Sequence, residues 1–494
     1  MVTTSNDLLT HSVHSAQPAG KAERDLSRVH SFASDELFTG GPHVLHEPNP
    51  YRRMLMPDAV AEVDFGAPLL ASEYAGHRAL AGHRILGTFY EAETVLLPEQ
   101  GLATLRGDFD AFYGPRLRRI RESCLSDLED FAFSFLAGEV EVTGGCTVDV
   151  LEAYFQHAVA EAEQGESASL AAIAGASDPA VAADTYLVQL ALDGLTEASA
   201  MSRNLGGAYG PEQSALFKIF IDEFGYGVFE AKHTSIFSKL LRSRAMQTHV
   251  HAYWNFYLAA PMATNNYYYY LSRDHAKFFR YAGAVTYAEA VFAPGFVKMI
   301  ETYRGVFGDE VDLHYCEEHA HIDQHHGRIT RDQVLLALAR RHGDGVVPEL
   351  LRGIAEARLL GAWFEEDTAA QIRWADSIDR HRELGAAALD GDAVAAGGTG
   401  GSTARGTGGS AGGSAGRPQR VELAAGHPFG TRNHDEPVVL QLADGEADLV
   451  TTATGRPHRL VRGDAVLVPA GRVYGVLAVS PRCAYQLHGA APVH

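Results

Sequence analysis

The segment HYCEEHAHIDQHHGR (residues 314–328) combines helical spacing with a high density of possible metal ligands. On an α-helix of about 3.6 residues per turn, His319, Asp323 and His326 stand at positions i, i+4 and i+7 and therefore lie on one face. Two imidazoles and a carboxylate in one row predict a metal site between packed helices. The spacing leaves open a second interpretation, in which this face is solvated and the histidines only make structural hydrogen bonds.

The size and charge of the chain limit the class of protein it encodes. Its 494 residues exceed the length at which a single hydrophobic core usually stops growing, so we expect two or three domains. The 41 Lys and Arg residues against 62 Asp and Glu residues give a formal net charge of -21, which opposes attraction to nucleic acid and to anionic lipid. We therefore expect no nucleic-acid partner.

Two further features concern the compartment and the type of metal ligand. Residues 1–25 contain no apolar stretch long enough for a signal-peptide core, and no other segment has the roughly 18 apolar residues of a membrane helix. The 4 cysteines lie far apart without CxxC spacing, which argues against a disulfide framework and against a thiolate zinc site. We expect a cytoplasmic protein without a membrane partner, in which nitrogen and oxygen atoms hold any metal.

The composition divides the chain into a helical body and a β-rich end. Residues 393–418 are a Gly/Ser/Thr-rich tract with almost nothing to bury, which predicts a flexible linker that couples its two sides only loosely. Helical spacing dominates before the linker, whereas short runs such as VVLQL and AVLVP over residues 419–494 predict a small antiparallel barrel. Residues 1–35 are polar and predict a disordered tail.

Local signals predict individual helices within the body. The stretch TRDQVLLALARRHGDG (330–345) begins with a possible capping box of Thr330 and Gln333 and ends at Gly343, so it predicts a separate helix. The run NNYYYYLSRDH (265–275) is most simply explained as core and interface packing.

Two acids stand alone in apolar or small-residue stretches of the body. Glu197 lies in LALDGLTEASAM and Glu289 lies in YAGAVTYAEAVFAPGF, where an unpaired carboxylate would be costly to bury. A dinuclear iron site in a helical bundle draws about six carboxylate and imidazole ligands from several helices, which would compensate both acids. An isolated acid in such a stretch is more often a rim residue, so that interpretation also stays open.

A further candidate pair, Glu223 and His233, lies in IDEFGYGVFEAKH. The ten-residue separation leaves the two side chains about 80° out of alignment on a regular helix, at about 100° per residue. Gly225 and Gly227 between them could allow a local distortion, and we expect a π-bulge because such bulges are frequent at functional sites.

At these residues the chain resembles the N-nitrosourea synthases, which are haem-oxygenase-like diiron oxidases fused to a cupin domain. The resemblance covers most of the chain before the linker, and it is carried by NPYRRMLMP (49–57), LTEASAMSRN (195–204), YGPEQSALFKIFIDEFGYGVFEAKH (209–233), EEHAHIDQHHGR (317–328) and HGDGVVPELLRGIAEARLL (342–360).

The resemblance implies a mainly α, multidomain fold with a C-terminal β-barrel of cupin type. It implies an N-terminal helical domain over 36–145 that helps to form a homodimer, a haem-oxygenase-like diiron domain over 146–392, and a cupin-like domain over 419–494. The family's iron ligands, which would also be the catalytic residues, fall on seven positions of this chain: Glu197, Glu223, His233, Glu289, His319, Asp323 and His326.

The resemblance also implies cofactors and partners. These are two Fe(II) ions per chain in the helical domain, O₂ as cosubstrate, an external electron donor such as a reductase, and a small cationic arginine derivative such as N-methylarginine as substrate. Oxygen and imidazole ligands with open coordination positions suit Fe(II).

The β-rich end departs from the cupin pattern of this family, which binds a further iron through three histidines. The motif GDAVLVPAGRVY (463–474) places Tyr474 at one ligand position, and TRNHDEPVV (431–439) places Arg432 at another. Only His434 matches, and a fixed guanidinium cation opposes Fe(II), so we expect a cupin-like fold without metal. A site rebuilt from other histidines is the alternative: His427, His458 and His488.

These features together predict an O₂-dependent non-haem diiron monooxygenase that hydroxylates a guanidine or related nitrogen in specialised metabolism, such as antibiotic biosynthesis. One alternative is a complete N-nitrosourea synthase with an active cupin. Others are a diiron oxidase that converts a different amine to a nitro group, and a non-catalytic iron-binding or sensing module.

Overall fold

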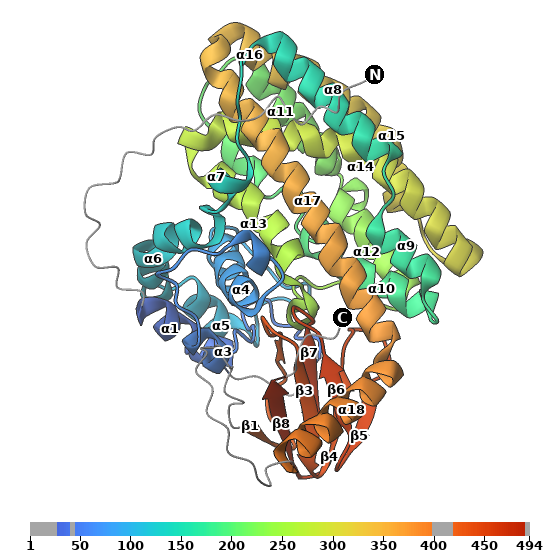
Figure 1. The fold of residues 1–494 in the computed structure, drawn as a ribbon. Coiled ribbons are helices and arrows are strands. Elements are labelled where there is room, and N and C mark those ends of the chain that lie inside the picture. The colour runs from blue at the N-terminus through green and yellow to red at the C-terminus, as the bar shows by residue number, and fades with distance from the viewer. Residues whose placement is uncertain (1–26, 40–44, 398–417, 490–494) are drawn as a thin grey trace, which may run out of the picture.

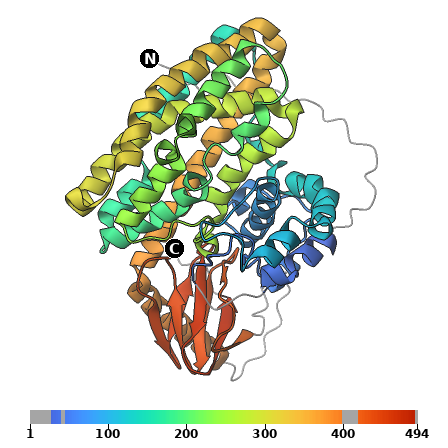
Figure 2. The ribbon, with the colours of Figure 1, turned by 180° about the vertical axis from the view of Figure 1, so that it is seen from behind.

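The structure, a computed structural model, describes residues 27–39, 45–397 and 418–489. It confirms the predicted fold class, a mainly helical chain with a C-terminal antiparallel β-domain. Figure 1 shows a long helical bundle, with the smaller N-terminal helices and the strands both placed against one end of it. Figure 2 shows the same arrangement from behind.

The N-terminal helices lie beside the bundle. They are α1 (Ser27–Ala33), α2 (Glu36–Thr39), α3 (Pro57–Ala61), α4 (His77–Glu91), α5 (Arg106–Phe112), α6 (Pro115–Phe133) and α7 (Leu136–Glu139). The bundle itself contains α8 (Val148–Gln164), α9 (Ala168–Gly175), α10 (Pro179–Gly194), α11 (Pro211–Glu223), α12 (His233–Ser243), α13 (Ala259–Arg273), α14 (Phe278–Phe307), α15 (His314–Ile329), α16 (Leu336–His342) and α17 (Val347–Asp376), and α18 (Ile378–Gly397) follows it.

The β-domain is built from two four-stranded antiparallel sheets. Their strand orders are β1-β8-β3-β6 and β2-β7-β4-β5. The strands are β1 (Gln419–Ala424), β2 (Thr431–Arg432), β3 (Val438–Asp444), β4 (Glu446–Val450), β5 (His458–Val461), β6 (Ala465–Val468), β7 (Tyr474–Ala478) and β8 (Arg482–Gly489). Apolar side chains of both sheets form one buried cluster, which is the double-sheet arrangement of jelly rolls and cupins.

Two predicted boundaries need correction. Helix α1 occupies residues that we expected in a disordered tail over 1–35, and it is ordered because Val29 and Phe32 are buried in the main core. The predicted linker over 393–418 also begins too early, since α18 continues to Gly397. Residues 1–26 and 398–417, which hold the rest of these two predictions, lie outside the described residues.

The capping box predicted at Thr330 is also wrong. Helix α15 runs without a break into a π-helical segment (Thr330–Leu335) and then into α16, which ends at Gly343 as predicted. The Thr330 hydroxyl donates a hydrogen bond to the carbonyl of His326 at 2.9 Å and so caps no new helix. The π-segment directly follows the ligand row.

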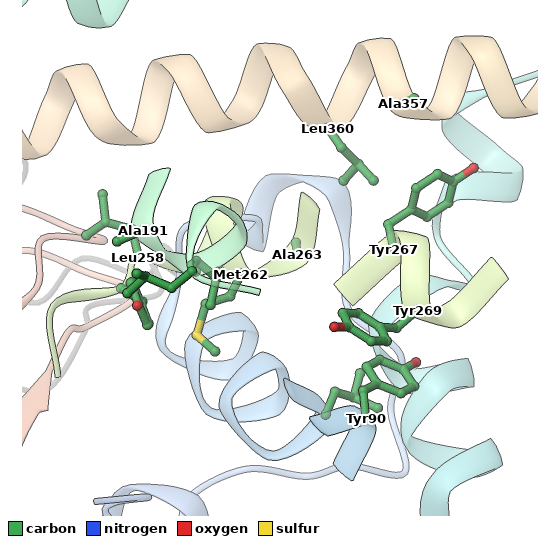
Figure 3. Packing of buried hydrophobic residues seen from close by; sticks show 14 of the residues in the cluster. Tyr90, Ala191, Leu258, Met262, Ala263, Tyr267, Tyr269, Ala357 and Leu360 are labelled. Atoms are coloured by element: carbon green, nitrogen blue, oxygen red, sulfur yellow. The ribbon is translucent and has the colours of Figure 1, made fainter. Parts of the chain in front are cut away.

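The N-terminal helices and the bundle share one continuous hydrophobic core. Figure 3 shows part of it, where side chains of α4, α13 and α17 meet. The Tyr90 ring of α4 stacks on the Tyr269 ring of α13 with centroids 5.6 Å apart. The tyrosine run is therefore partly core packing, as the sequence indicates, and it ties the two helical parts together.

The β-domain is firmly packed on the helices, which contradicts the expected loose coupling. Arg472 forms a buried ion pair with Asp367 of α17 at 2.8 Å. On the same helix, the Gln371 amide donates to the carbonyls of Thr451 at 3.0 Å and Val473 at 2.8 Å. These buried contacts between the β-domain and α17 do not depend on the linker.

Helices α14 and α17 cross at two glycines. A Cβ atom on Gly283 would lie 2.1 Å from the Leu350 carbonyl oxygen, and one on Gly353 would lie 2.0 Å from the Arg280 carbonyl oxygen. Backbone atoms cannot rotate away as a flexible side chain could. The crossing thus fixes the position of α14, which carries one of the predicted ligands.

We expect Gly353→Ala to destabilise the fold by about 3 kcal/mol, because the new Cβ atom would collide with the Arg280 carbonyl oxygen and force α14 and α17 apart. Gly361→Ala in the same helix is the control: a Cβ there meets nothing within 4 Å. It should stabilise the protein by up to about 1 kcal/mol through helix propensity. Thermal unfolding of both variants checks this, and equal stability of the two would contradict the close crossing.

Candidate metal centre

The seven predicted ligands lie together inside the bundle, although they come from distant parts of the chain. They form two groups, in each of which the ligand atoms all lie within 4.8 Å of one another: Glu197, Glu223, His233 and His319 in the first, and Glu223, Glu289, Asp323 and His326 in the second. Glu223 belongs to both groups. One carboxylate can therefore bridge two metal ions.

The break between α11 and α12 brings Glu223 and His233 together. Glu223 is the last residue of α11 and His233 is the first residue of α12, and two short 3-10 turns, Gly225–Gly227 and Phe229–Ala231, interrupt the helical path between them in place of the expected π-bulge. Gly225 makes this interruption possible because its φ is +59° and a Cβ atom there would lie 2.5 Å from the backbone of Ala231. No other residue type fits both conditions.

Glu197 also lies outside regular helix. Helix α10 ends at Gly194, and Ala198 directly after the ligand has a φ of +60°. A non-glycine residue in this region is strained, and such strain often accompanies functional sites. The turn directs the Glu197 carboxylate toward the α15 histidines, with which it makes the contact described next.

In the first group, the imidazoles and carboxylates already lie at close distances. The His233 Nδ1 atom lies 2.6 Å from Glu223 Oε2, and the His319 Nε2 atom lies 2.9 Å from Glu197 Oε1. The two histidines are themselves 3.2 Å apart between His233 Nδ1 and His319 Nε2. These atoms surround one point, as the ligands of a single ion would.

The second group is centred on His326. Its Nδ1 atom lies 3.4 Å from Glu223 Oε1, 3.3 Å from Glu289 Oε2 and 3.5 Å from Asp323 Oδ1. His326 is 0% exposed and Asp323 is 1% exposed. Three carboxylates around one imidazole nitrogen leave a buried position that a cation can fill.

In each of the two predicted histidine ligands on α15, the ring nitrogen that points away from the ligand group contacts an oxygen acceptor. The His326 Nε2 atom lies 3.2 Å from Asp222 Oδ2, and the His319 Nδ1 atom lies 2.9 Å from the Tyr315 carbonyl oxygen. An acceptor behind an imidazole fixes which nitrogen faces the metal and makes it a better ligand. The predictions missed Asp222, since nothing in its spacing distinguishes it from a surface acid.

The chemistry of the donor set fits divalent iron. Within the described residues, the buried Glu197 Oε2 and Asp323 Oδ2 atoms have no hydrogen-bond partner, which is costly unless a cation binds them. The four carboxylates of the two groups would carry four negative charges, which two divalent ions balance. Mixed carboxylate and imidazole ligands suit Fe(II).

The same crowding changes the proton affinity of the histidines. Burial by itself lowers the pKa of His319, but the Glu197 carboxylate outweighs it and raises the pKa to about 10. For His326, burial is again outweighed, here by Asp323 and Glu289, and the pKa rises to about 11. Without metal, both imidazoles therefore hold a second proton at neutral pH.

Comparisons with known proteins agree with this site. Residues 184–362 match a family described as iron-containing redox enzymes, and this range contains all seven ligands. The chain is 35% identical over 457 residues to nitrosourea synthase from Streptomyces achromogenes subsp. streptozoticus. This alignment covers 92% of this chain and 93% of the relative. The chain belongs to the nitrosourea synthase family. As a member of this family, it is an oxidoreductase of the iron-containing class.

An open cavity lies beside the two ligand groups. Ligands of both groups reach its wall, among them Glu197 and Glu289. Tyr268 and Tyr269 of α13 line the cavity as well, so the tyrosine run contributes to the site and not only to the core. A small molecule in this cavity would contact both metal positions.

At the predicted cupin ligand positions, the β-domain carries Arg432, His434 and Tyr474 in place of three histidines. The Tyr474 hydroxyl and His434 Nε2 are hydrogen-bonded at 2.8 Å, and Arg432 pairs in register with Tyr474 across β2 and β7. Burial, with the nearby Arg432 cation, lowers the pKa of His434 to about 4, so this imidazole stays neutral. That the domain binds no metal stays a prediction.

No helix in the described ranges has both the length and the apolar composition needed to cross a membrane.

The shared ligand gives a test by metal counting. Glu223→Ala should remove both metal ions, because each group loses a ligand, whereas Glu289→Ala should retain one ion in the first group. Titration with Mn(II), followed by elemental analysis, measures the stoichiometry. His321→Ala is the control, since this exposed histidine belongs to neither group. Equal metal loss in the Glu223 and Glu289 variants would contradict a bridging Glu223.

The raised histidine pKa values give a pH dependence. Metal ions bind only a deprotonated imidazole nitrogen, so loading of the metal-free protein must release protons, and apparent affinity must rise with pH. Calorimetric titration with Mn(II) between about pH 6 and pH 8, in buffers of different ionisation enthalpy, measures both effects. Affinity that stays constant over this range would show that His319 and His326 do not bind the metal.

Proposed function

We propose that this protein is an O₂-dependent non-haem diiron monooxygenase that hydroxylates a guanidine nitrogen of an arginine-derived substrate in specialised metabolism. The observation that carries the proposal is the pair of ligand groups joined by Glu223 beside a cavity. The seven catalytic ligands proposed from the sequence are the members of these groups. The similarity to nitrosourea synthase supports a nitrogen-containing substrate.

Two ferrous ions held by these groups would supply electrons and open coordination positions for the activation of O₂. In a monooxygenase, one oxygen atom enters the substrate as N–OH and the other leaves as water. The balance requires two electrons and two protons from outside. We therefore propose an external electron donor, such as a reductase, as a partner.

The residues of the chain give this reaction its geometry. Glu223 would help to hold a metal ion in each group, and Asp222 behind His326 orients that imidazole. The Tyr315 hydroxyl donates to Glu197 Oε1 at 3.1 Å and so fixes the carboxylate on the strained turn. Tyrosine, alanine and valine side chains of α13 and α14 form the cavity wall, where they would exclude bulk water from the reacting nitrogen.

We further propose that the product stops at the N-hydroxylated stage. This part rests on the β-domain, where Arg432 and Tyr474 stand at ligand positions and Tyr474 binds the remaining histidine. Within the described residues, the groups of clustered ligands are the two in the bundle. The β-domain then has a structural role, consistent with its buried contacts to α17. A homodimer formed through residues 36–145 is part of the same proposal.

The test is oxidation of candidate substrates by the Fe(II)-loaded protein. We expect O₂ consumption to accelerate when N-methylarginine is added, and mass spectrometry to find products with one or two added oxygen atoms. His326→Ala should lose this activity while its circular dichroism and unfolding temperature stay near those of the wild type. His321→Ala should keep the activity, because its side chain is exposed.

Two outcomes would overturn parts of this proposal. O₂ consumption that ignores every guanidine and amine offered would indicate an iron-binding module in place of an oxygenase. An N-nitroso product from the unmodified protein, with a third iron per chain, would indicate a complete nitrosourea synthase with an active β-domain.

A further inference from the structure

One acid on the cavity wall has no role among the metal ligands. The cavity is lined by five acids, four of which are ligands, and the fifth is Asp193 in the last turn of α10. Among the described residues, no ion pair or hydrogen bond of the Asp193 side chain is present, in contrast to Asp184 of the same helix, which pairs with Arg244. Its side chain is accessible where it lines the cavity.

The surroundings of Asp193 make an unpaired charge unfavourable. The exposed Asp193 side chain lines the cavity together with the Glu197 and Glu223 carboxylates, so like charges repel one another there. Two divalent metal ions would neutralise the four ligand carboxylates, which leaves Asp193 as the uncompensated acid of the cavity. The described lining contains no lysine or arginine that could pair with it. A cation delivered from outside would satisfy this carboxylate.

The remaining wall suits a flat, delocalised cation. Tyr268 and Tyr269 of α13 line the cavity together with Asp193 and Glu289. Guanidinium groups stack on aromatic faces and pair with carboxylates through two parallel hydrogen bonds. The C-terminal end of α10 beside Asp193 adds the negative end of a helix dipole.

We propose that Asp193 binds the guanidinium group of the substrate and, with Tyr268, holds it against the metal positions. This inference rests on the proposed function and extends it to a specificity-determining residue. Because Asp193, Tyr268 and Glu289 line the same cavity, a guanidinium seated on this tyrosine lies beside both the anchor and a ligand of the second group. One nitrogen pairs with Asp193 while another is presented to the metals.

The test compares a charged substrate with a neutral one of the same shape. Asp193→Asn should weaken binding of N-methylarginine by on the order of 10-fold, as expected for loss of one partner from a charge pair in a partly open cavity. Binding of N-methylcitrulline, which replaces the guanidinium by a neutral urea, should change less than about threefold. Anaerobic calorimetry on the Fe(II)-loaded protein measures both affinities without turnover.

Two variants serve as references. Glu230→Gln removes one acid from the exposed turn between α11 and α12, outside the cavity, and should change neither affinity. Asp193→Glu keeps the charge and should recover most of the preference for N-methylarginine over N-methylcitrulline. Metal content and circular dichroism of each variant should match those of the wild type.

The outcomes separate this inference from the proposed function. If wild-type protein oxidises N-methylarginine and Asp193→Asn binds it equally well, the anchor is wrong and the function stands. If both proteins show the expected difference in affinity but neither oxidises the ligand, the anchor stands and the function is wrong. A preference for simple alkylamines over guanidines in the wild type would overturn the guanidinium assignment.

Discussion

The burial of the Glu223 carboxylate between two groups of ligands is the constraint on which this structure depends. Four carboxylates and three imidazoles lie in a space from which water is largely excluded. Such a cluster is stable only when protons or metal ions balance its charge. The raised pKa values of His319 and His326 show how protons do this when metal is absent. Metal binding would exchange those protons for the charge of the bound cations.

The surrounding architecture keeps this cluster in place. Three of the predicted ligands lie at a helix end or on a strained turn: Glu197, Glu223 and His233. Their positions therefore depend on how the helices pack and not on helical periodicity alone. The glycine crossing of α14 and α17 fixes the helix that carries Glu289. Helix α17 also binds the β-domain through Asp367 and Gln371. The same helix α17 therefore contacts both the ligand-bearing α14 and the β-domain.

The sequence predicted the ligand row well because periodicity in a continuous helix is a local property. His319, Asp323 and His326 are buried on one face of α15 as expected. Local reasoning failed where the chain leaves a regular helix. Near Gly225 the structure has short 3-10 turns in place of the predicted π-bulge, and the π-segment lies at Thr330–Leu335 instead. The predicted tail was too long because the burial of Phe32 depends on partners from other helices.

By itself, the sequence determined the fold class, the types of ligand and the family, since these depend on composition, spacing and motifs that survive at 35% identity. Only the tertiary structure decided that Glu223 belongs to both groups, that Asp222 supports His326, and that Asp193 faces a cavity beside the metal positions. The physical reason is that an acid acquires its role from its neighbours. Asp184 and Asp193 lie on the same helix, yet one pairs with Arg244 and the other faces the cavity.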